Sequence, residues 1–598
     1  MTGQSSIQTL RINPDAMNRN RLIGVIENDT KFDHSQEARE RSMNAPERVY
    51  SPINGVSANT VRTVTLDKRP TSQQEGSTGA GSQHTARHTD GKQAKDSADS
   101  RPRAVVIGAG LGGLSAAIHL ARQGWKVDML ERNTRSGGRM NVIQEQGFSI
   151  DMGPTMLMMP EVIEKIFTDC GRDIKDYMPL TRLTPAYRIA WPDGTLLEMG
   201  GTMEELIASV RTFAPDDADR LPALYERMRT KYLNARHNFI ERSFNSVRDM
   251  MRPSTLQGLV KSFPMESVYQ FVSKNIRDER LRQAFTFQTL YLGMSPYTCP
   301  SIYALLPYIE MEFGVWYPQG GTIALADSLE RLFGELDGTI HYNQDVERIL
   351  LDGRTARGVR TADGNDWHAD VVVSNMDVPM AYKKLLPPEV RRKHTDARIE
   401  KCDYGCSGYM MYLGVEHIET NWAHNMIVLS DNYEQILDDI CVKQILPRDP
   451  AMHVCIPTLT DKSLAPEGHD VVYVLVPCPN TLGKIDWKRQ GPLLRDRVID
   501  KLEATGLPGL REKIVFERIF TPDDFEKTYG CFAGAAFSGL TPSFMQSAYF
   551  RPHSRSEDIR NLYFVGASTH PGGGVPIVLT SGRLAAEEIA LTTRARRK

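Results

Sequence analysis

Residues 103–140 read R-A-V-V-I-G-A-G-L-G-G-L-S-A-A-I-H-L-A-R-Q-G-W-K-V-D-M-L-E-R-N-T-R-S-G-G-R-M, and this stretch decides the fold. Gly108, Gly110 and Gly113 form a G-x-G-x-x-G pattern between an apolar run at 104–107 and apolar residues at helical spacing at 114–122. The glycines therefore lie at a strand-to-helix turn. Because free N–H groups at a helix N-terminus bind anions, the stretch predicts a site for the pyrophosphate of a dinucleotide.

The residues around this turn each have a physical use. Gly108 permits the tight turn, Gly110 lets the backbone approach the phosphates, and Gly113 lets the helix pack on the strand. A second strand at 125–130 ends in Glu131, whose carboxylate can bind a ribose diol. A glycine pattern alone is weak evidence, but strand, helix, second strand and acid occur together here.

A second glycine pair indicates which dinucleotide is bound. In Gly137-Gly138-Arg139 the backbone can close on the phosphates again, while the guanidinium offers fixed donors to them. Nicotinamide-binding units usually run straight on to another βα unit. This G-G-R extension is instead typical of flavoproteins that resemble glutathione reductase and the amine oxidases. The alternative is an ordinary glycine turn with a solvated arginine, and the sequence favours FAD.

Composition bounds the rest of the chain. Of its 598 residues 24% are charged and 40% hydrophobic, and the formal net charge is −2. The length suggests about three or four domain-sized units, and the near-neutral charge gives no reason to expect a nucleic-acid partner. The eight cysteines show neither zinc-ligand spacing nor a compact disulfide framework, which indicates thiols in a reducing cytoplasm and no metal site.

The first hundred residues differ from the rest. Between 71 and 100 hardly any apolar residue appears, so the segment cannot bury enough surface to offset the entropy lost on ordering. We expect a disordered tail over 1–102. The tail lacks the apolar core of a signal peptide, and the chain has no apolar run of about eighteen residues that would span a bilayer.

Strands and then helices are expected after the glycine pair. A strand pair at 141–144 and 147–151 leads into Met152-Gly153-Pro154-Thr155, where the Gly-Pro pair fixes an extended turn. From 160 to about 275 the apolar spacing predicts helices at 160–170, 203–213, 217–240 and 266–274.

Two features of this region leave alternatives open. Leu256, Leu259, Val260 and Phe263 share one apolar face near Arg252 and Lys261, which suits either an interfacial helix on a membrane or a helix packed on the core. The Met-rich runs at 156–159 and 250–251 suit either the walls of an apolar tunnel or core filling.

The chain then returns to the first sheet. A motif at 316–322 precedes a helix at 323–336, and strands are expected around 339–342 and 370–374 with a hairpin between them. The nucleotide-binding domain is therefore expected to be discontinuous. Apolar strands within 381–535 indicate a separate α+β region, notably at 409–415, 453–458 and 471–476, with helices near 431–440 and 493–505.

A third glycine-rich stretch lies near the C-terminus. Residues 561–579 read N-L-Y-F-V-G-A-S-T-H-P-G-G-G-V-P-I-V-L, and a helix is expected at 580–591. Strand, glycine turn and helix N-terminus again make a site that suits an anion, here for the ribityl chain and pyrimidine edge of a flavin. Two such turns at opposite ends of the chain indicate one long ligand.

These motifs carry a resemblance. Over 104–589 the chain resembles the bacterial and fungal type of carotenoid desaturase, the phytoene desaturase family. The segments that carry it are V-I-G-A-G-L-G-G-L, S-G-G-R, D-M-G-P-T, R-L-R-Q-A-F (280–285), G-V-W-Y-P-Q-G-G-T (314–322), S-L-A-P-E-G (463–468), Q-S-A-Y-F-R-P-H (546–553) and N-L-Y-F-V-G-A-S-T-H-P-G-G-G-V-P (561–576).

The resemblance implies an α/β protein with a discontinuous Rossmann-like FAD-binding domain, an inserted α+β substrate domain and a helical, membrane-facing subdomain. The corresponding segments are FAD-binding parts at 103–185, 316–378 and 548–598, a helical region at 186–315 and the substrate domain at 379–547. The implied cofactor contacts are Gly108, Gly110, Gly112, Gly113, Glu131, Gly137, Gly138, Arg139, Gly153, Pro154, Thr155, Val346, Gly566, Ala567, Ser568, Gly574, Val575 and Pro576. Ser568 and Ile577 stand where the family usually has glycine.

The implied activity is dehydrogenation of a linear isoprenoid such as phytoene or its C30 analogue by non-covalent FAD. Such an enzyme would lie peripherally on the inner face of the cell membrane and pass electrons to a quinone or to oxygen. Asp249, beside Arg248, matches a family position where an acidic residue near the substrate could handle a proton, and His570 is a weaker candidate. The alternative for Asp249 is a helix cap or an arginine-paired carboxylate.

Three rival functions share parts of this pattern. A carotenoid isomerase or retinol saturase-like reductase would share the flavin site. An amine oxidase is less favoured, because no cysteine near the last glycine turn could form the covalent flavin link that many amine oxidases have. A Rab escort or GDP-dissociation-inhibitor type of protein would keep the fold without oxidation, and the intact glycine turns argue against it.

Overall fold

The computed structural model describes residues 100–244, 249, 251 and 266–597. Most of the tail expected over 1–102 lies outside these residues, and so does the apolar face expected at Leu256, Leu259, Val260 and Phe263.

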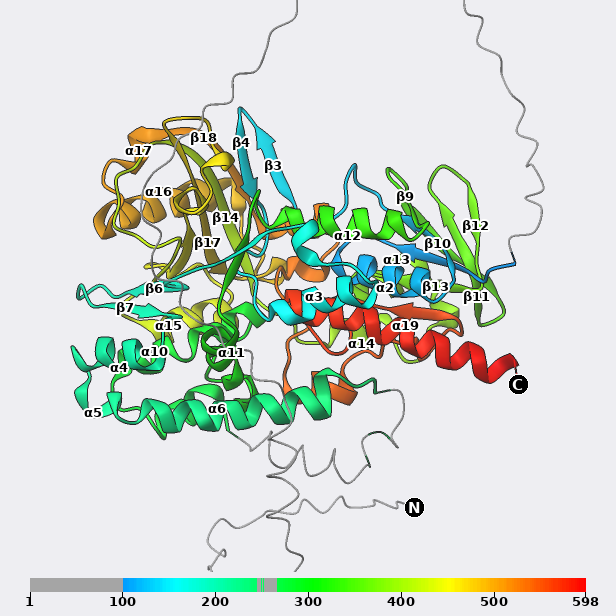
Figure 1. The fold of residues 1–598 in the computed structure, drawn as a ribbon, viewed down its shortest axis with the longest axis horizontal. Coiled ribbons are helices and arrows are strands. Elements are labelled where there is room, and N and C mark those ends of the chain that lie inside the picture. The colour runs from blue at the N-terminus through cyan, green and yellow to red at the C-terminus, as the bar shows by residue number, and fades with distance from the viewer. Residues whose placement is uncertain (1–99, 245–248, 250, 252–265, 598) are drawn as a thin grey trace, which may run out of the picture. The chain divides into compact units, whose positions relative to one another are not determined.

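A five-stranded parallel sheet carries the first glycine turn (Figure 1). Its order is β19-β13-β1-β2-β9, so the strand that precedes the turn, β1, lies in the centre. The strands come from three distant parts of the chain: β1 (Arg103–Ile107), β2 (Lys126–Leu130), β9 (Thr339–His341), β13 (Val371–Ser374) and β19 (Leu562–Phe564). The α/β fold expected from the sequence is confirmed.

Side chains that alternate along β1 build two different layers. Ala104 and Val106 pack in a core with α2 (Leu111–Arg122), α12 (Ile323–Glu335) and α19 (Val575–Arg597). Val105 and Ile107 point to the other face, where they join a core with the antiparallel sheet of β10 (Val346–Asp352), β11 (Thr355–Thr361) and β12 (Asp366–His368) and with α13 (Val378–Leu385). Both faces of the parallel sheet are thus covered, as apolar strands require.

The first and last helices of this layer touch closely. A Cβ atom at Gly582 of α19 would lie 2.6 Å from the Gly112 carbonyl oxygen and from the Ala116 nitrogen of α2. The Ser115 hydroxyl donates to the Leu579 carbonyl at 2.7 Å. The contact brings the beginnings of α2 and α19 to the same edge of the sheet.

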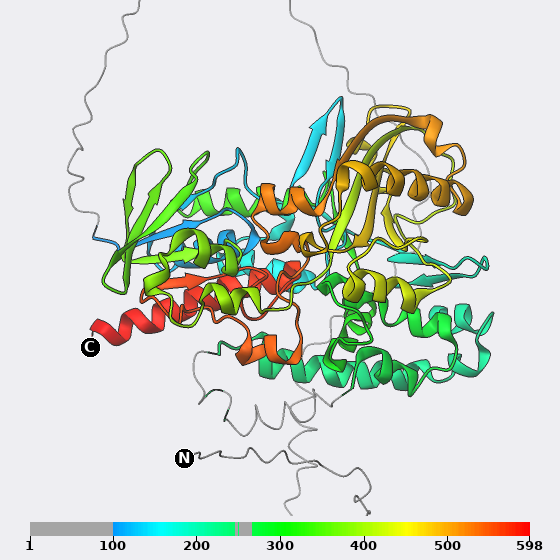
Figure 2. The ribbon, with the colours of Figure 1, turned by 180° about the vertical axis from the view of Figure 1, so that it is seen from behind.

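The second large sheet of the molecule has seven strands and is mixed (Figure 2). Successive side chains of β14 (Ser407–Glu416) face two different cores. Met410 and Tyr412 face one core. Tyr409, Met411 and Leu413 face the other, which α16 (Trp487–Thr505) and α17 (Leu510–Lys513) cover. The strand order is β18 (Ile514–Phe520), β14 (Ser407–Glu416), β17 (His469–Cys478), β16 (Met452–Cys455), β15 (Asn425–Val428), β6 (Tyr187–Ala190) and β7 (Leu196–Met199).

The hairpin of β6 and β7 departs from the helical pattern expected between 160 and 275. Tyr187 and Ile189 are buried in the sheet core, and the turn between the strands contains Pro192-Asp193-Gly194. A Pro-Asp-Gly turn between apolar runs is a hairpin signal. β6 pairs in parallel with β15, so residues from the expected helical region complete the sheet of the α+β region.

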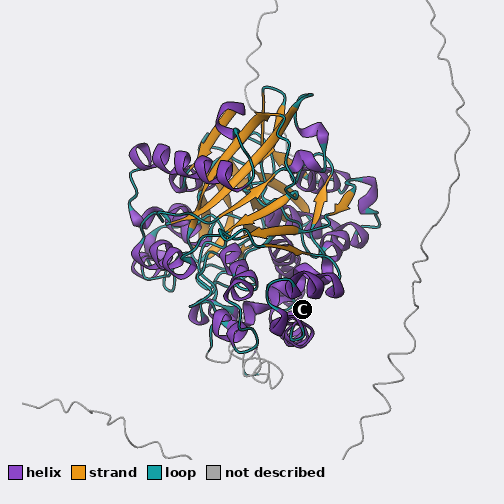
Figure 3. Ribbon diagram, turned by 90° about the vertical axis from the view of Figure 1, so that its left-hand side faces the viewer, coloured by secondary structure: helices purple, strands orange, loops and turns teal. Residues whose placement is uncertain are grey.

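The remaining elements include a helical layer under the seven-stranded sheet (Figure 3). This layer comprises α4 (Met203–Arg211), α5 (Pro215–Ala218), α6 (Leu221–Ala235), η2 (Arg236–Ile240), α9 (Val268–Ser273), α10 (Glu279–Ala284), η3 (Phe287–Leu292), η4 (Ser301–Leu305) and α11 (Leu306–Phe313). Elsewhere lie β3 (Val142–Glu145), β4 (Phe148–Asp151), α3 (Pro160–Asp169), β5 (Leu180–Arg182), β8 (Trp316–Pro318), α14 (Asp396–Glu400), α15 (Tyr433–Asp438), η6 (Asp439–Lys443), α18 (Pro522–Tyr529), η11 (Phe544–Gln546) and η12 (Ala548–Phe550).

Within the described ranges, no helix combines the length and the apolar content that crossing a bilayer requires.

Gly582→Ala tests the contact between α2 and α19. The new methyl group would press on the backbone of α2, and overpacking of this kind costs about 1–3 kcal/mol. We expect a lower melting temperature than that of the wild type. Gly334→Ala in α12 is the matched control, because no atom lies within 4 Å of its Cβ position and alanine favours helix. Equal melting temperatures for the two variants would contradict the tight packing.

Candidate functional site

One cavity runs from the carboxyl edge of the parallel sheet to the inner face of the seven-stranded sheet. Gly108, Glu131 and Asn375, which follow β1, β2 and β13, line one end, and Met410 and Leu475 line the other. Its volume of about 530 Å³ lies within the range of about 300–1,000 Å³ that small-molecule and cofactor sites occupy. Open parallel sheets bind ligands at this edge.

The glycine turns and the residues expected with them meet at this cavity. Of the expected cofactor contacts, Gly113 alone does not line the cavity. It packs the helix on the strand instead, and a Cβ atom added to it would lie 2.2 Å from the Gly108 carbonyl oxygen. Those in the lining are Gly108, Gly110, Gly112, Glu131, Gly137, Gly138, Arg139, Gly153, Pro154, Thr155, Val346, Gly566, Ala567, Ser568, Gly574, Val575 and Pro576.

The backbone at the turns leaves room for an anionic ligand. Gly110 caps α2 without a side-chain hydrogen bond, and the first turn of the helix has no acidic residue. Gly110 also bridges Gly137, and a Cβ atom at Gly112 would lie only 2.9 Å from the Gly566 nitrogen. The first turn of α19 likewise has no acidic residue. Helix N-termini without acidic residues beside a glycine backbone fit the phosphates of FAD.

Glu131 is buried at the end of β2. Its Oε2 accepts a hydrogen bond from the Ala109 nitrogen at 2.7 Å, and its Oε1 accepts from the Asn133 nitrogen at 2.9 Å and from Asn133 Nδ2 at 2.8 Å. The carboxylate is therefore fixed against the glycine turn, at the position expected for contact with the ribose.

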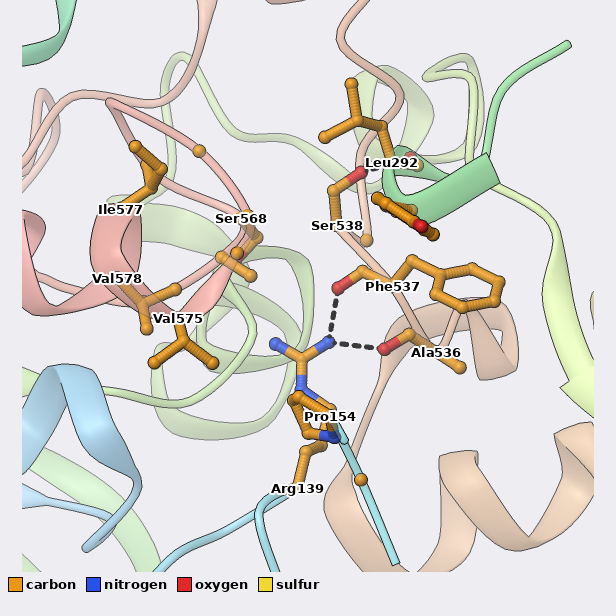
Figure 4. A pocket seen from close by; sticks show the side chains of 18 of the residues that line it. Arg139, Pro154, Leu292, Ala536, Phe537, Ser538, Ser568, Val575, Ile577 and Val578 are labelled. Atoms are coloured by element: carbon orange, nitrogen blue, oxygen red, sulfur yellow. Dashed lines mark hydrogen bonds between the residues drawn. The ribbon is translucent and has the colours of Figure 1, made fainter. Parts of the chain in front are cut away.

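Arg139 is held differently from the sequence expectation. Its Nη1 donates to the carbonyls of Ala536 at 2.8 Å and Phe537 at 2.7 Å (Figure 4). These bonds tie the loop at 536–537 to the cavity wall, and within the described part of the chain no hydrogen bond is made by Nε or Nη2. A phosphate contact of Arg139 remains a prediction.

Asn375 is a site residue that the sequence reasoning missed. It follows β13 and lies between the two glycine turns. A Cβ atom added to Gly110 would lie 2.5 Å from Asn375 Nδ2, and one added to Gly566 would lie 2.7 Å from Asn375 Oδ1. Polar residues directly after a parallel strand lie at the ligand-binding edge, and Asn375 could have been found by this signal.

Ser568, expected to depart from a glycine position, has a clear structural use. Its hydroxyl accepts a hydrogen bond from the Val378 nitrogen at 2.8 Å, at the start of α13. The neighbouring Asp377 is half-buried at the cavity and accepts a hydrogen bond from the Phe532 nitrogen at 2.8 Å, and desolvation raises the pKa of its carboxyl.

Arg551, in the Q-S-A-Y-F-R-P-H segment, is 2% exposed. Burial lowers the pKa of its guanidinium, which is nevertheless satisfied by backbone oxygens. It donates to the carbonyls of Ser538, Leu540, Gln546, Ala567 and Thr569. This arginine fastens the third glycine turn to the loop that faces it.

The far part of the cavity is apolar. The expected tunnel residues Met156, Met158 and Met159 line it, whereas Met251 is 62% exposed and Met250 lies outside the described residues. Other apolar lining residues include Phe287, Leu290, Leu306, Ile309, Met410, Ile427, Leu429, Ile436, Leu437, Ile440 and Leu475. An elongated apolar molecule suits this wall.

The expected proton-handling residues are not brought together. Asp249 is half-buried and is not among the described residues that line the cavity, and Arg248 lies outside the description. His570 lines the cavity, its Nε2 bonds to the Arg242 carbonyl at 2.7 Å, and burial lowers the pKa of its imidazole to about 4. His570 is therefore neutral at pH 7.

Arg551→Ala tests how the third glycine turn is fastened. It would leave buried carbonyls without donors, and each unsatisfied group costs about 1–3 kcal/mol, so we expect a loss of at least about 3 kcal/mol in unfolding free energy. Arg357→Ala is the control, since its ion pair with Asp352 is exposed and contributes at most about 1 kcal/mol. Urea unfolding followed by tryptophan fluorescence measures both, and similar losses would contradict this role.

Comparison with known proteins places the chain in a family. The family model described as flavin containing amine oxidoreductase matches residues 111–590. The zeta-carotene-forming phytoene desaturase of Myxococcus xanthus is 41% identical over 488 residues, which cover 81% of this chain and 93% of that protein. The 4,4'-diapophytoene desaturase (4,4'-diaponeurosporene-forming) of Staphylococcus aureus strain Newman is 35% identical over 81% of this chain and 98% of its own length.

A solved oxidoreductase structure from Methanosarcina mazei shares the fold, with a TM-score of 0.56 at 18% identity over 82% of this chain and all of that chain. The resemblance carried by the sequence motifs is thereby confirmed, as is FAD as the cofactor. The chain belongs to the flavin-containing amine oxidoreductases and, within them, to the FAD-dependent carotenoid desaturases of the phytoene desaturase type.

Proposed function

We propose that this protein is a carotenoid desaturase that uses FAD to introduce double bonds into a linear C40 isoprenoid such as phytoene. One observation carries the proposal: a single cavity joins a glycine-lined end that suits a dinucleotide to an apolar end that suits a polyene. The similarity to the phytoene desaturase of Myxococcus xanthus supports the same substrate class.

The geometry of the glycine turns supports a proposal for the residues that hold FAD. Gly110 and Gly112 at the start of α2 would face the pyrophosphate, Glu131 the ribose, and the turn at 566–576 the ribityl chain and pyrimidine edge. FAD held by these residues would supply the acceptor for the hydride of the substrate. The chain itself orients the polyene and excludes water.

The C30 reaction is the second candidate. It is favoured by the 35% identity to the diapophytoene desaturase of Staphylococcus aureus. Asp249, with Arg248, stays our proposal for a residue that handles the substrate proton. A quinone or oxygen would reoxidise the flavin.

We also propose peripheral contact with the inner face of the cell membrane. An apolar patch of Phe544, Met545 and Phe550 is 49%, 64% and 40% exposed, and the two phenylalanine rings lie 6.2 Å apart. Ser547 and Ala548, between them in the chain, line the cavity. A substrate dissolved in lipid requires such a surface beside the entrance to its site.

Expression in hosts that accumulate either phytoene or 4,4'-diapophytoene tests the function. We expect coloured products with additional conjugated double bonds from the C40 host, identified by absorption spectrum and mass. Products with altered geometry but unchanged mass would favour an isomerase. Purified protein without bound flavin would favour a prenyl-binding protein of the GDP-dissociation-inhibitor type, and unchanged substrate in both hosts would contradict the proposal.

The double variant Phe544→Ser, Met545→Ser tests the membrane patch. Burying one such side chain contributes about 1.5–3 kcal/mol when complete, so we expect liposome binding to weaken at least about tenfold in co-sedimentation. Leu196→Ser on β7, which is 52% exposed and outside the cavity lining, is the control and should bind as the wild type does. Unchanged binding of the double variant would exclude this patch.

A further inference from the structure

His453 brings an imidazole into the apolar wall of the cavity. It lies on β16, between Ile427 of β15 and Leu475 of β17 in the register of the sheet, and all three residues line the cavity. The side chain is half-buried. Because β16 is an interior strand with a paired strand on each side, the exposed part of the ring opens into the cavity.

Hydrogen bonds to the neighbouring strand fix which ring nitrogen carries the proton. Asn425 Nδ2 donates to the Ala186 carbonyl at 3.2 Å, which identifies Asn425 Oδ1 as an acceptor. His453 Nε2 lies 3.0 Å from this oxygen and therefore donates to it. In the neutral ring, Nδ1 then carries a lone pair. Within the described part of the chain Nδ1 makes no hydrogen bond, and protein atoms do not enclose it.

The surroundings keep this ring neutral. Burial lowers the pKa of the His453 imidazole to about 4. The titratable groups beside it are the Tyr473 phenol on β17, whose ring centroid is 6.0 Å away, and the His424 imidazole, whose pKa burial lowers to about 3. Both groups are uncharged at pH 7. A linear hydrocarbon offers no hydrogen-bond donor to the lone pair of Nδ1, which stays available for a proton.

His453 lies close to the proposed flavin end of the cavity. The Tyr473 hydroxyl donates to the Gly153 carbonyl at 3.1 Å. Gly153 belongs to the Gly-Pro turn, which is among the implied FAD contacts and lines the cavity. One aromatic ring therefore separates His453 from this turn, and a polyene that reaches the flavin along the sheet passes the imidazole.

The other candidates for handling a proton are placed less favourably. His570 lines the cavity, but its Nε2 bonds to the Arg242 carbonyl, and its Nδ1 is enclosed without a partner among the described residues. Asp249 is not among the described residues that line the cavity. Of these three side chains, His453 is the one that offers an accessible lone pair to a bound substrate.

We propose that His453 is a catalytic residue whose Nδ1 accepts the substrate proton, an inference that rests on the proposed desaturase function. As hydride leaves one substrate carbon for the oxidised cofactor, the C–H bond of the neighbouring carbon supplies the electron pair of the new double bond. Its proton passes to Nδ1, and the ring becomes an imidazolium that Asn425 Oδ1 holds in place.

The low basicity of His453 suits both halves of this step. A C–H bond beside a carbon that is losing hydride is strongly acidic, so a weak base is sufficient. An imidazolium with a pKa of about 4 gives up its proton readily at pH 7, so the neutral ring returns once the product leaves.

Anaerobic single-turnover reduction of the flavin tests this role, with phytoene and 4,4'-diapophytoene in liposomes as substrates. We expect His453→Ala and His453→Gln to be slower by about 100-fold, a typical contribution of a positioned base. Millimolar imidazole should enter the space left in His453→Ala and raise its rate at least about tenfold. Pyrrole has a ring of the same size without a basic nitrogen and should not. The wild-type rate should be constant between pH 6 and 8, because Nδ1 is unprotonated throughout.

Ile427→Ala is the matched control. Ile427 lies opposite His453 on β15 and also lines the cavity, so its truncation leaves a space in the same wall. Any loss of rate in this variant should respond no more to imidazole than to pyrrole.

Nitrogen NMR of the FAD-loaded protein, labelled with ¹⁵N-histidine, supplies a readout without substrate. The signals of His453 are identified by their loss in His453→Gln. At pH 7 they should show a protonated Nε2 and a bare Nδ1.

The outcomes separate the role of His453 from the desaturase function. A wild-type rate in His453→Ala and His453→Gln, a rescue that pyrrole gives as well as imidazole, or a His453 ring protonated at Nδ1 overturns this role alone. A wild-type flavin that neither substrate reduces overturns the proposed function and the role together.

Discussion

The close backbone contact between the start of α2 and the turn after β19 is the constraint on which the site depends. A side chain at Gly112 would reach within 2.9 Å of the Gly566 nitrogen, so the two turns can meet only as bare backbone. The contact joins the segments that follow the first and the last strand in sequence of the parallel sheet. It also aims two helix N-termini at one edge of the parallel sheet, where an extended anionic ligand can lie across both.

The rest of the molecule extends that edge into an apolar space. The seven-stranded sheet and the helical layer share one core, and the cavity runs into it from the glycine turns. Arg551 and Arg139 fasten the loop at 536–540 over the junction by donating to its carbonyls. One end of the cavity is therefore polar backbone held by the buried Arg551 and the half-buried Arg139, and the other is lined by methionine, leucine and isoleucine. This division matches a cofactor and a polyene that must touch.

The sequence predicted the features whose cause is local. Glycines at strand-to-helix turns, Glu131 after the second strand and the Gly-Pro turn at 153–154 are each required by the conformation of a few neighbouring residues, and all of them except Gly113 line the cavity. Asn375 and Arg551 were missed because their partners are distant in sequence, on other turns. The hairpin of β6 and β7 was missed because surrounding helical patterns outweighed a short Pro-Asp-Gly turn. α19 begins at Val575 rather than near Thr580, since Pro576 fits the first turn of a helix.

We propose that one cavity holds FAD and the polyene together. A structure of the FAD-loaded protein with a bound C40 polyene is the most direct test. We expect the isoalloxazine ring beside the turn at 566–576, and the polyene in contact with the ring and with Met410, Ile427 and Tyr291 of the cavity wall. A polyene bound outside this cavity, or a flavin whose ring lies away from the third glycine turn, would contradict it.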